Sequence, residues 1–229
     1  MTLTSEIKET KMNDKVLTSW SHLYKRRREI YKTYPDFWKL KVKKKIIDII
    51  FETIEAYQKG TNQICALDVG SNDRVMGNKI KIKYPHFQYE SMDIDREQHH
   101  DYYDLGQIQK KFDMVFSFEV IEHIVFEEGI QMLRQIFDLL KPGGKLVIST
   151  PNVFHPNRYW EYSHKVSYRY DEMGGILLSL GYKINHIYRI YNDAFVKRLL
   201  RLWVAAPLHQ YLCVDFAKSI LLVAEKPSA

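Results

Sequence analysis

Short, nearly uncharged runs that alternate with segments of helical apolar spacing constrain the fold of this chain more than any other feature. The runs that we expect to form strands are residues 64–69, 87–92, 113–118, 145–150, 183–191 and 219–225. The segments that we expect to form helices are residues 37–58, 75–83, 120–140 and 171–180. Strands that alternate with helices form a mainly parallel sheet, and ligands bind at the carboxyl ends of its strands.

Length and charge predict one α/β domain with a basic extension before it. A chain of 229 residues with 45% hydrophobic content can bury one substantial core. Residues 1–60 hold 14 Lys and Arg against 8 Asp and Glu, so they carry the excess positive charge of the chain. We therefore divide the chain into a basic helical extension, residues 1–60, and an α/β domain, residues 61–229. The basic residues would meet an anionic partner such as RNA or a membrane surface, or they form a solvated helix face.

The apolar segments and cysteines narrow the class of protein further. No run of about 18 uncharged apolar residues occurs, and residues 1–15 lack the apolar stretch of a signal peptide. We therefore expect a cytoplasmic protein. Cys65 and Cys213 lie far apart in apolar runs, so we expect buried thiols and not a disulfide framework or a zinc site.

Four motifs follow one another along the expected strands and their ends. They are Ala66-Leu67-Asp68-Val69-Gly70-Ser71-Asn72, Met92-Asp93-Ile94-Asp95, Phe112-Asp113-Met114-Val115-Phe116-Ser117-Phe118-Glu119-Val120-Ile121-Glu122-His123, and Leu140-Lys141-Pro142-Gly143-Gly144-Lys145-Leu146-Val147-Ile148-Ser149-Thr150-Pro151-Asn152. In this order they resemble the motifs of class I (Rossmann-like) S-adenosylmethionine-dependent methyltransferases. The resemblance implies a doubly wound, mainly parallel seven-stranded sheet with an antiparallel last strand, and it makes residues 61–229 the methyltransferase domain.

The resemblance also implies S-adenosylmethionine as the cofactor, with S-adenosylhomocysteine as the product. It places Asp68 and Gly70 at the methionine end, where glycine lets the chain turn without a side chain in the way. It places the carboxylate of Asp93 at the ribose hydroxyls and that of Asp104 at the adenine amino group. The residues that we expect to contact the cofactor are Asp68, Gly70, Ser71, Asn72, Asp93, Ile94, Asp104, Leu105, Phe118 and Glu119.

The loop after the first motif strand departs from the family pattern, because Gly70 is followed by Ser71, Asn72 and Asp73 instead of further glycines. Asn and Asp tolerate left-handed backbone angles, so the turn can still form. A nicotinamide-binding domain would need the spacing G-x-G-x-x-G to seat a pyrophosphate, and this loop does not supply it.

The string from Glu119 to His123 is similar to small-molecule and glycan O-methyltransferases, so we expect a small-molecule or glycan acceptor. A sulfonium methyl group is already activated, and the enzyme mainly has to align the acceptor with it. A base is needed where the acceptor must lose a proton. His123 and His164 are the candidate catalytic residues, since an imidazole suits this task near neutral pH; a structural role is the other interpretation of each.

A divalent metal site is the more specific alternative to a catalytic base. Glu119, Glu122 and His123 stand at i, i+3 and i+4 at the start of an expected helix, and His164 follows a strand that should end nearby. This pattern resembles the metal site of terminal-ribose RNA methyltransferases, and the basic extension would suit an RNA. We favour the interpretation without a metal.

Two segments of the expected domain are candidates for binding partners. Residues 152–170 are rich in His, Tyr, Trp and Arg, and we expect them to form a lid over the acceptor or a packed connector. Residues 193–218 form a basic amphipathic insertion that would touch a membrane, cover a lipid-linked substrate, join a homodimer or pack on the sheet. A cofactor-binding subunit without catalysis is a third interpretation, against which Asp68, Gly70 and Asp93 argue.

Overall fold

A computed structural model describes residues 19–43, 45–58, 63–156, 161–191, 195–200, 203 and 206–228. Its centre is a seven-stranded sheet in the order β1-β6-β7-β5-β4-β2-β3. The strands are β1 (Lys41–Lys43), β2 (Cys65–Val69), β3 (Gln88–Met92), β4 (Phe112–Phe118), β5 (Leu140–Pro151), β6 (Lys183–Ile190) and β7 (Ser219–Glu225). Only β7 runs antiparallel to its neighbours, β5 and β6. The predicted Rossmann-like, mainly parallel seven-stranded sheet with an antiparallel last strand is confirmed.

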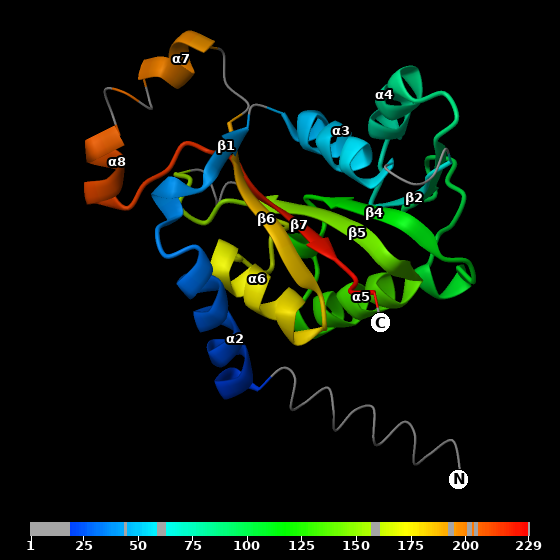
Figure 1. The fold of residues 1–229 in the computed structure, drawn as a ribbon, viewed down its shortest axis with the longest axis horizontal. Coiled ribbons are helices and arrows are strands. Elements are labelled where there is room, and N and C mark those ends of the chain that lie inside the picture. Colours follow the sequence, from blue (N-terminus) through cyan, green and yellow to red (C-terminus); the bar gives the residue numbers. More distant parts are fainter. Residues whose placement is uncertain are drawn as a thin grey trace.

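Helices cover both faces of this sheet (Figure 1). On one face lie α3 (Ile46–Tyr57) and α4 (Val75–Lys83), and on the other lie α5 (Phe126–Leu139) and α6 (Tyr170–Ser179). Each face has its own apolar core, because successive strand residues point to opposite faces. In β2, for example, Ala66 packs in the core under α3 and α4, whereas Leu67 packs in the core under α5 and α6.

The helix predicted over residues 37–58 is wrong in its first half. Phe37–Lys39 form a 3₁₀ turn, η1, and Lys41–Lys43 form β1; the helix α3 begins only at Ile46. The strand β1 pairs in parallel with β6 and occupies the edge of the sheet. Pairing of its backbone with β6 therefore overrides the helical spacing of the apolar side chains.

The helix predicted over residues 120–140 is also wrong at its start. Glu119 has a left-handed backbone (φ 55°), Ile121–His123 form a 3₁₀ turn, η4, and α5 begins at Phe126. The left-handed Glu119 and the 3₁₀ turn after it separate β4 from α5. The turn η4 therefore presents Glu122 and His123 from an irregular segment at the end of β4.

The N-terminal extension contains a helix, α2 (Trp20–Thr33), that packs along α6. Arg27 donates from Nε to Asp171, at 2.6 Å, and Asp171 is almost completely buried. The Cβ that an alanine would add at Gly175 of α6 lies 2.8 Å from the backbone nitrogen of Arg27, so only glycine allows this approach. The extension is thus part of the packed structure, and residues 1–18 lie outside the described residues.

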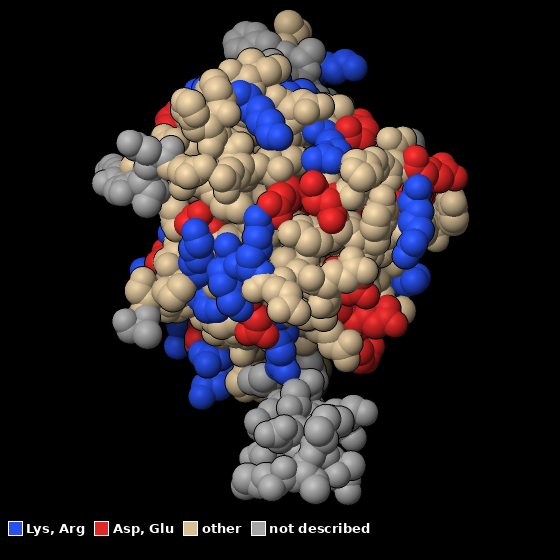
Figure 2. Space-filling view, turned by 90° about the vertical axis from the view of Figure 1, so that its right-hand side faces the viewer, with Lys and Arg blue, Asp and Glu red and all other residues tan. Residues whose placement is uncertain are grey.

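Several basic residues of the extension, residues 1–60, form ion pairs within the fold. Arg26 pairs with Glu29 at 3.0 Å, and Lys43 pairs with Glu52. The surface on the side of α4 and the edge strand β3 carries basic and acidic side chains next to each other (Figure 2). The ion pairs of Arg26 and Lys43 reduce the positive field that the extension would offer to a polyanion.

The insertion between β6 and β7 contains the short helices α7 (Phe195–Leu199) and α8 (Ala206–Leu212), which stand beyond the end of the sheet (Figure 1). Its described apolar side chains are mostly exposed: Val196, Leu199, Leu200, Trp203, Tyr211 and Leu212. These exposed side chains therefore do not pack on the sheet.

Cys213 is exposed and Cys65 is half-buried, so the prediction of two buried thiols is wrong. None of the described helices is long and apolar enough to cross a membrane.

Candidate functional site

Two neighbouring cavities open at the carboxyl ends of the parallel strands. The first, of about 500 Å³, lies between the loops after β2, β3 and β4. The second, of about 720 Å³, lies between the start of α3, α4 and the ends of β5 and β6. Glu119, at the end of β4, lines both cavities. The arrangement suits two ligands that meet at one point.

Gly70 shapes the first cavity through its backbone. Its φ is +74°, and an added Cβ would lie 2.3 Å from Cγ2 of Val120. Both facts require glycine, because other residues disfavour this angle and any side chain would collide with the turn after β4. The backbone of Gly70 therefore comes close to whatever occupies the cavity.

Asp93 follows β3 on the facing side of the first cavity. Its Oδ2 accepts a hydrogen bond from the backbone N–H of Asn72, at 2.9 Å, and its Oδ1 accepts from that of Asp95, at 3.0 Å. Each carboxylate oxygen can accept a further hydrogen bond. Asp93 thus ties the loop after β2 to the loop after β3 and still has capacity for two hydroxyl groups.

The far end of the first cavity is a largely apolar slot. Asp104 and Leu105 line it, as does the exposed Ile94. Oδ1 of Asp104 accepts from the backbone N–H of Gly106, at 2.7 Å, which fixes the carboxylate. Sequence analysis missed further residues of this slot, because they come from several elements without a common motif: Tyr103, Ile124, Met132 and Gln135.

The other residues expected at the cofactor lie next to the first cavity without lining it. Asp68 is buried and accepts a 2.6 Å hydrogen bond from the hydroxyl of Tyr89; burial raises its pKa to about 7. Ser71 is also buried, and its Oγ contacts Nδ1 of His100 at 3.1 Å. Phe118 stacks on Phe116 in the core below α3 and α4. The side chains of Asp68, Ser71 and Phe118 therefore point into the protein interior and not into the first cavity.

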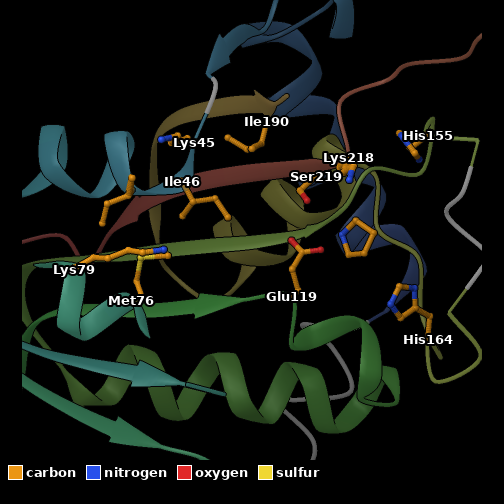
Figure 3. A pocket seen from close by; sticks show the side chains of 12 residues that line it. Lys45, Ile46, Met76, Lys79, Glu119, His155, His164, Ile190, Lys218 and Ser219 are labelled. Carbon is orange, nitrogen blue, oxygen red and sulfur yellow. The ribbon is translucent and has the colours of Figure 1, made fainter. Parts of the chain in front are cut away.

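The second cavity combines apolar walls with basic side chains (Figure 3). In this view Lys45 and Lys79 lie toward one end, and Lys218 lies near Ser219, with His155 and His164 toward the other end. Sequence analysis identified His164 and the segment of His155, but not the three lysines. Each lysine comes from a different element, so no local pattern joins them.

Glu119 sits at the junction of the cavities in a strained backbone conformation. Such strain is often retained at functional sites. Its Oε1 accepts a 2.6 Å hydrogen bond from the hydroxyl of Ser149. Burial raises the pKa of Glu119, while hydrogen bonds from Ser149 and Ser219 and the nearby His164 oppose this rise.

Glu122, His123 and His164 form a compact cluster beside this junction. Each offers a ligand atom, and these atoms lie within 4.8 Å of one another. Both carboxylate oxygens of Glu122 are buried without a hydrogen-bond partner among the described residues, and burial, followed by the charge of Glu119, raises its pKa to about 8. Glu119, the fourth residue of the expected metal set, is not in this cluster.

The hydrogen bonds of Ser163 set the proton position on His123. Oγ of Ser163 donates to Oε1 of Glu161, at 3.1 Å, and lies 2.9 Å from Nδ1 of His123. A hydroxyl has one proton to donate. When Oγ of Ser163 donates to Glu161, Nδ1 of His123 carries the proton in their shared bond, and Nε2 then presents a lone pair that can accept a proton or bind a cation.

The expected lid, residues 152–170, is partly a packed connector. Asn152 is buried and donates from Nδ2 to Oδ2 of Asp215, at 2.9 Å. Tyr168 and Tyr170 are buried in the core below α6. Of the described lid residues, His155 and His164 line the second cavity. Residues 157–160 of the expected lid, which include Trp160, lie outside the described residues.

A profile described as a methyltransferase domain matches residues 24–201. The chain belongs to this family. The methyltransferase is 33% identical over 85 residues to ubiquinone biosynthesis O-methyltransferase of Ruegeria pomeroyi, which covers 37% of this chain and 33% of that protein. The matched stretch therefore spans about a third of that relative's length.

Solved structures share the fold of the methyltransferase. One is a SAM-dependent methyltransferase from Archaeoglobus fulgidus, with a TM-score of 0.59 and 16% identity, covering 79% of this chain and 94% of that chain. Another is the plantazolicin methyltransferase BpumL in complex with SAH, with a TM-score of 0.54 and 15% identity, covering 98% of each chain. At these identities the solved structures show a shared fold, and the profile match shows that the chain contains a methyltransferase domain, whose expected cofactor is S-adenosylmethionine.

The first cavity fits this cofactor in its chemistry. Gly70 provides the close backbone approach, and a Cβ there would fill the space beside Val120. Asp93 would accept from ribose hydroxyls, the slot around Leu105 would face a base, and Asp104 would accept from its amino group; all three residues line this cavity. These residues would hold the cofactor, which supplies a methyl group activated by a positively charged sulfur.

Proposed function

We propose that the methyltransferase transfers its methyl group to a hydroxyl oxygen of a small molecule or glycan that binds in the second cavity. The observation that carries this proposal is the position of Glu119, which lines both cavities at their junction. His164 lines the second cavity, and its ring centroid lies 4.8 Å from that of His123, which lines the first. Two imidazoles therefore stand where an acceptor oxygen and a methyl group would meet.

The protein's part in this reaction is to orient the acceptor and remove its proton. On transfer of the cofactor's methyl group to the acceptor oxygen, an imidazole nitrogen would take up the hydroxyl proton. Nε2 of His123 is suited to this step because Ser163 holds the proton on Nδ1. The apolar walls of the second cavity would help to hold the acceptor in position for the transfer.

A screen of hydroxyl-bearing sugars and phenols with a labelled methyl donor tests the proposal. We expect His123→Gln and His164→Gln to lower kcat by about 100-fold or more on the acceptor found, since general bases contribute about 10²–10⁴-fold. His86→Gln is the matched control, because His86 is an exposed histidine that lines neither cavity. Methyl transfer to nitrogen or sulfur acceptors alone would refute the assignment of an oxygen acceptor.

A metal-assisted RNA ribose methyltransferase is the second candidate. The cluster of Glu122, His123 and His164 favours it, because a divalent cation would satisfy the two unpartnered oxygens of Glu122. The ion pairs of the basic extension favour the first candidate, because they leave fewer free positive charges for an RNA. Chelation with EDTA distinguishes the two: under the first candidate transfer persists, and under the second it stops and returns with Mg²⁺ or Mn²⁺.

A further inference from the structure

We propose that the acceptor carries an anionic group, a phosphate or a carboxylate, that Lys45, Lys79 and Lys218 bind in the second cavity. This inference rests on the proposed function, because it names the substrate class of the same site. The three lysines come from separate parts of the chain: Lys45 precedes α3, Lys79 lies in α4, and Lys218 precedes β7. The fold brings their ammonium groups around one cavity (Figure 3).

The side chains of these lysines have no ion pair or hydrogen bond with any part of the chain that the structure describes. Other lysines near the sheet do: Lys83 pairs with Glu55 at 2.8 Å, and Lys145 pairs with Glu225. Lysine ammonium groups bind phosphate and carboxylate through charge-assisted hydrogen bonds. Three unpaired ammonium groups around one cavity are therefore available for an external anion.

The cavity offers little negative charge against these lysines. Glu119 is the acidic residue among its described lining residues. Its Oε1 accepts from the hydroxyl of Ser149, so three ammonium groups face a single carboxylate in this cavity. The balance of charge in the cavity is accordingly positive.

The remaining walls indicate the shape of the acceptor. Ile46 and Ile190 contribute apolar surface between the two ends of the cavity, and Met76 lies beside Lys79 (Figure 3). In Figure 3, Lys45 and Lys79 lie toward the end away from His164. An acceptor with its anionic group at Lys45 and Lys79 would therefore place an apolar body in the middle and a hydroxyl near His164. Lys218, close to Ser219, would contact an acceptor with more than one anionic group.

Competition and binding measurements with defined probes test this inference. Inorganic pyrophosphate represents the phosphate source, and 4-hydroxybenzoate, compared with phenol, represents the carboxylate source. We expect at least one anion to bind the S-adenosylhomocysteine complex in calorimetry, and to bind more weakly as NaCl rises from about 0.05 to 0.5 M, because salt screens exposed charges. The probe that binds identifies the source.

The variant Lys45→Gln/Lys79→Gln/Lys218→Gln should bind that anion about 10- to 100-fold more weakly, since each exposed charge pair contributes modestly. Its affinity for S-adenosylhomocysteine and its melting temperature should stay unchanged. Lys32→Gln is the matched control, because Lys32 is an exposed lysine of α2 that does not line the cavity.

The inference is overturned if neither anion binds the wild-type protein, or if the triple variant binds as tightly as Lys32→Gln. The proposed function is read out separately, by labelled methyl transfer to neutral acceptors. Transfer to phenol without binding of either anion would leave the proposed function intact and refute the anionic acceptor. Anion binding at the lysines without methyl transfer to any hydroxyl would refute the proposed function and leave the anion site intact.

Discussion

Gly70 shows how one residue position couples the cofactor loop to the turn that follows β4. Its positive φ and its closeness to Val120 both depend on the missing side chain. We expect Gly70→Ala to lower the free energy of unfolding by about 1–3 kcal/mol, from backbone strain and overpacking. It should also abolish measurable binding of S-adenosylhomocysteine in calorimetry.

Two further variants separate the causes of this loss. Gly143→Ala has the same kind of backbone angle, φ +77°, but its added Cβ comes no closer than 3.4 Å to another group, so it should cost about 1 kcal/mol and leave binding intact. Adding Val120→Ala to Gly70→Ala should recover part of the stability. If Gly70→Ala unfolds like Gly143→Ala, the collision with Val120 has no consequence.

Asp93 carries the second prediction at this scale. Asp93→Ala should weaken binding of S-adenosylhomocysteine about 10- to 100-fold, because it removes charge-assisted hydrogen bonds to the ribose and the link to Asn72. Calorimetric titration measures the change. Asp95→Asn is the control, since Asp95 is exposed and does not line the cavity. Equal affinities of the two variants would contradict the role of Asp93.

Individual site residues were predictable where the backbone decides their position. Gly70, Asp93 and Asp104 follow from motif spacing, and the structure places all three at the first cavity. The side chains of Asp68 and Phe118 do not line this cavity. The alternation of side chains along a strand sets their direction, and this direction cannot be inferred from motif spacing. The cavity lysines had no local pattern that could reveal them.

At the scale of elements, the docking of α2 on α6 depends on Arg27. Its removal would leave the buried carboxylate of Asp171 with Arg169 as its remaining ion-pair partner. We expect Arg27→Ala to cost about 1–3 kcal/mol in urea unfolding. Arg26→Ala should cost less than about 0.5 kcal/mol, because Arg26 pairs with Glu29 on the surface. A similar cost for both variants would show that α2 is held by apolar contacts alone.

The strands and the helices between them were predictable because their apolar residues repeat with a clear period. The predicted ranges for β7 and α4 agree with the observed bounds, and those for the other core strands overlap them. The failures lie where contacts distant in sequence decide the structure. β1 forms because β6 offers an open edge, and η4 replaces the first turn of the predicted helix where the carbonyl of Glu122 accepts from the backbone N–H groups of Lys165 and Val166.

For the whole molecule, two buried acids predict a characteristic dependence of stability on pH. Burial raises the pKa of Asp68 to about 7 and that of Glu122 to about 8. In the unfolded chain such groups titrate near pH 4. At these two positions the folded protein therefore binds more protons than the unfolded chain between about pH 4 and 8, and their contribution to the free energy of unfolding falls as pH rises through this interval.

Thermal unfolding between pH 5 and 9 checks this dependence. The melting temperature of the wild type should fall toward pH 9, and Asp68→Asn should make that fall smaller. Asn keeps an oxygen that can accept from Tyr89 but has no proton to lose. Asp95→Asn, at an exposed position, should leave the slope unchanged. A wild-type melting temperature that rises toward pH 9 would mean that both carboxylates are ionised in the folded protein.

The two cavities and their shared residue, Glu119, join these observations into one account: cofactor on one side, acceptor on the other. A crystal structure of the protein with S-adenosylhomocysteine tests it most directly. The account predicts electron density in the first cavity, with the ribose at Asp93 and the adenine beside Leu105, and no such density in the second. Density for the ligand among Lys45, Lys79 and Lys218 would contradict it.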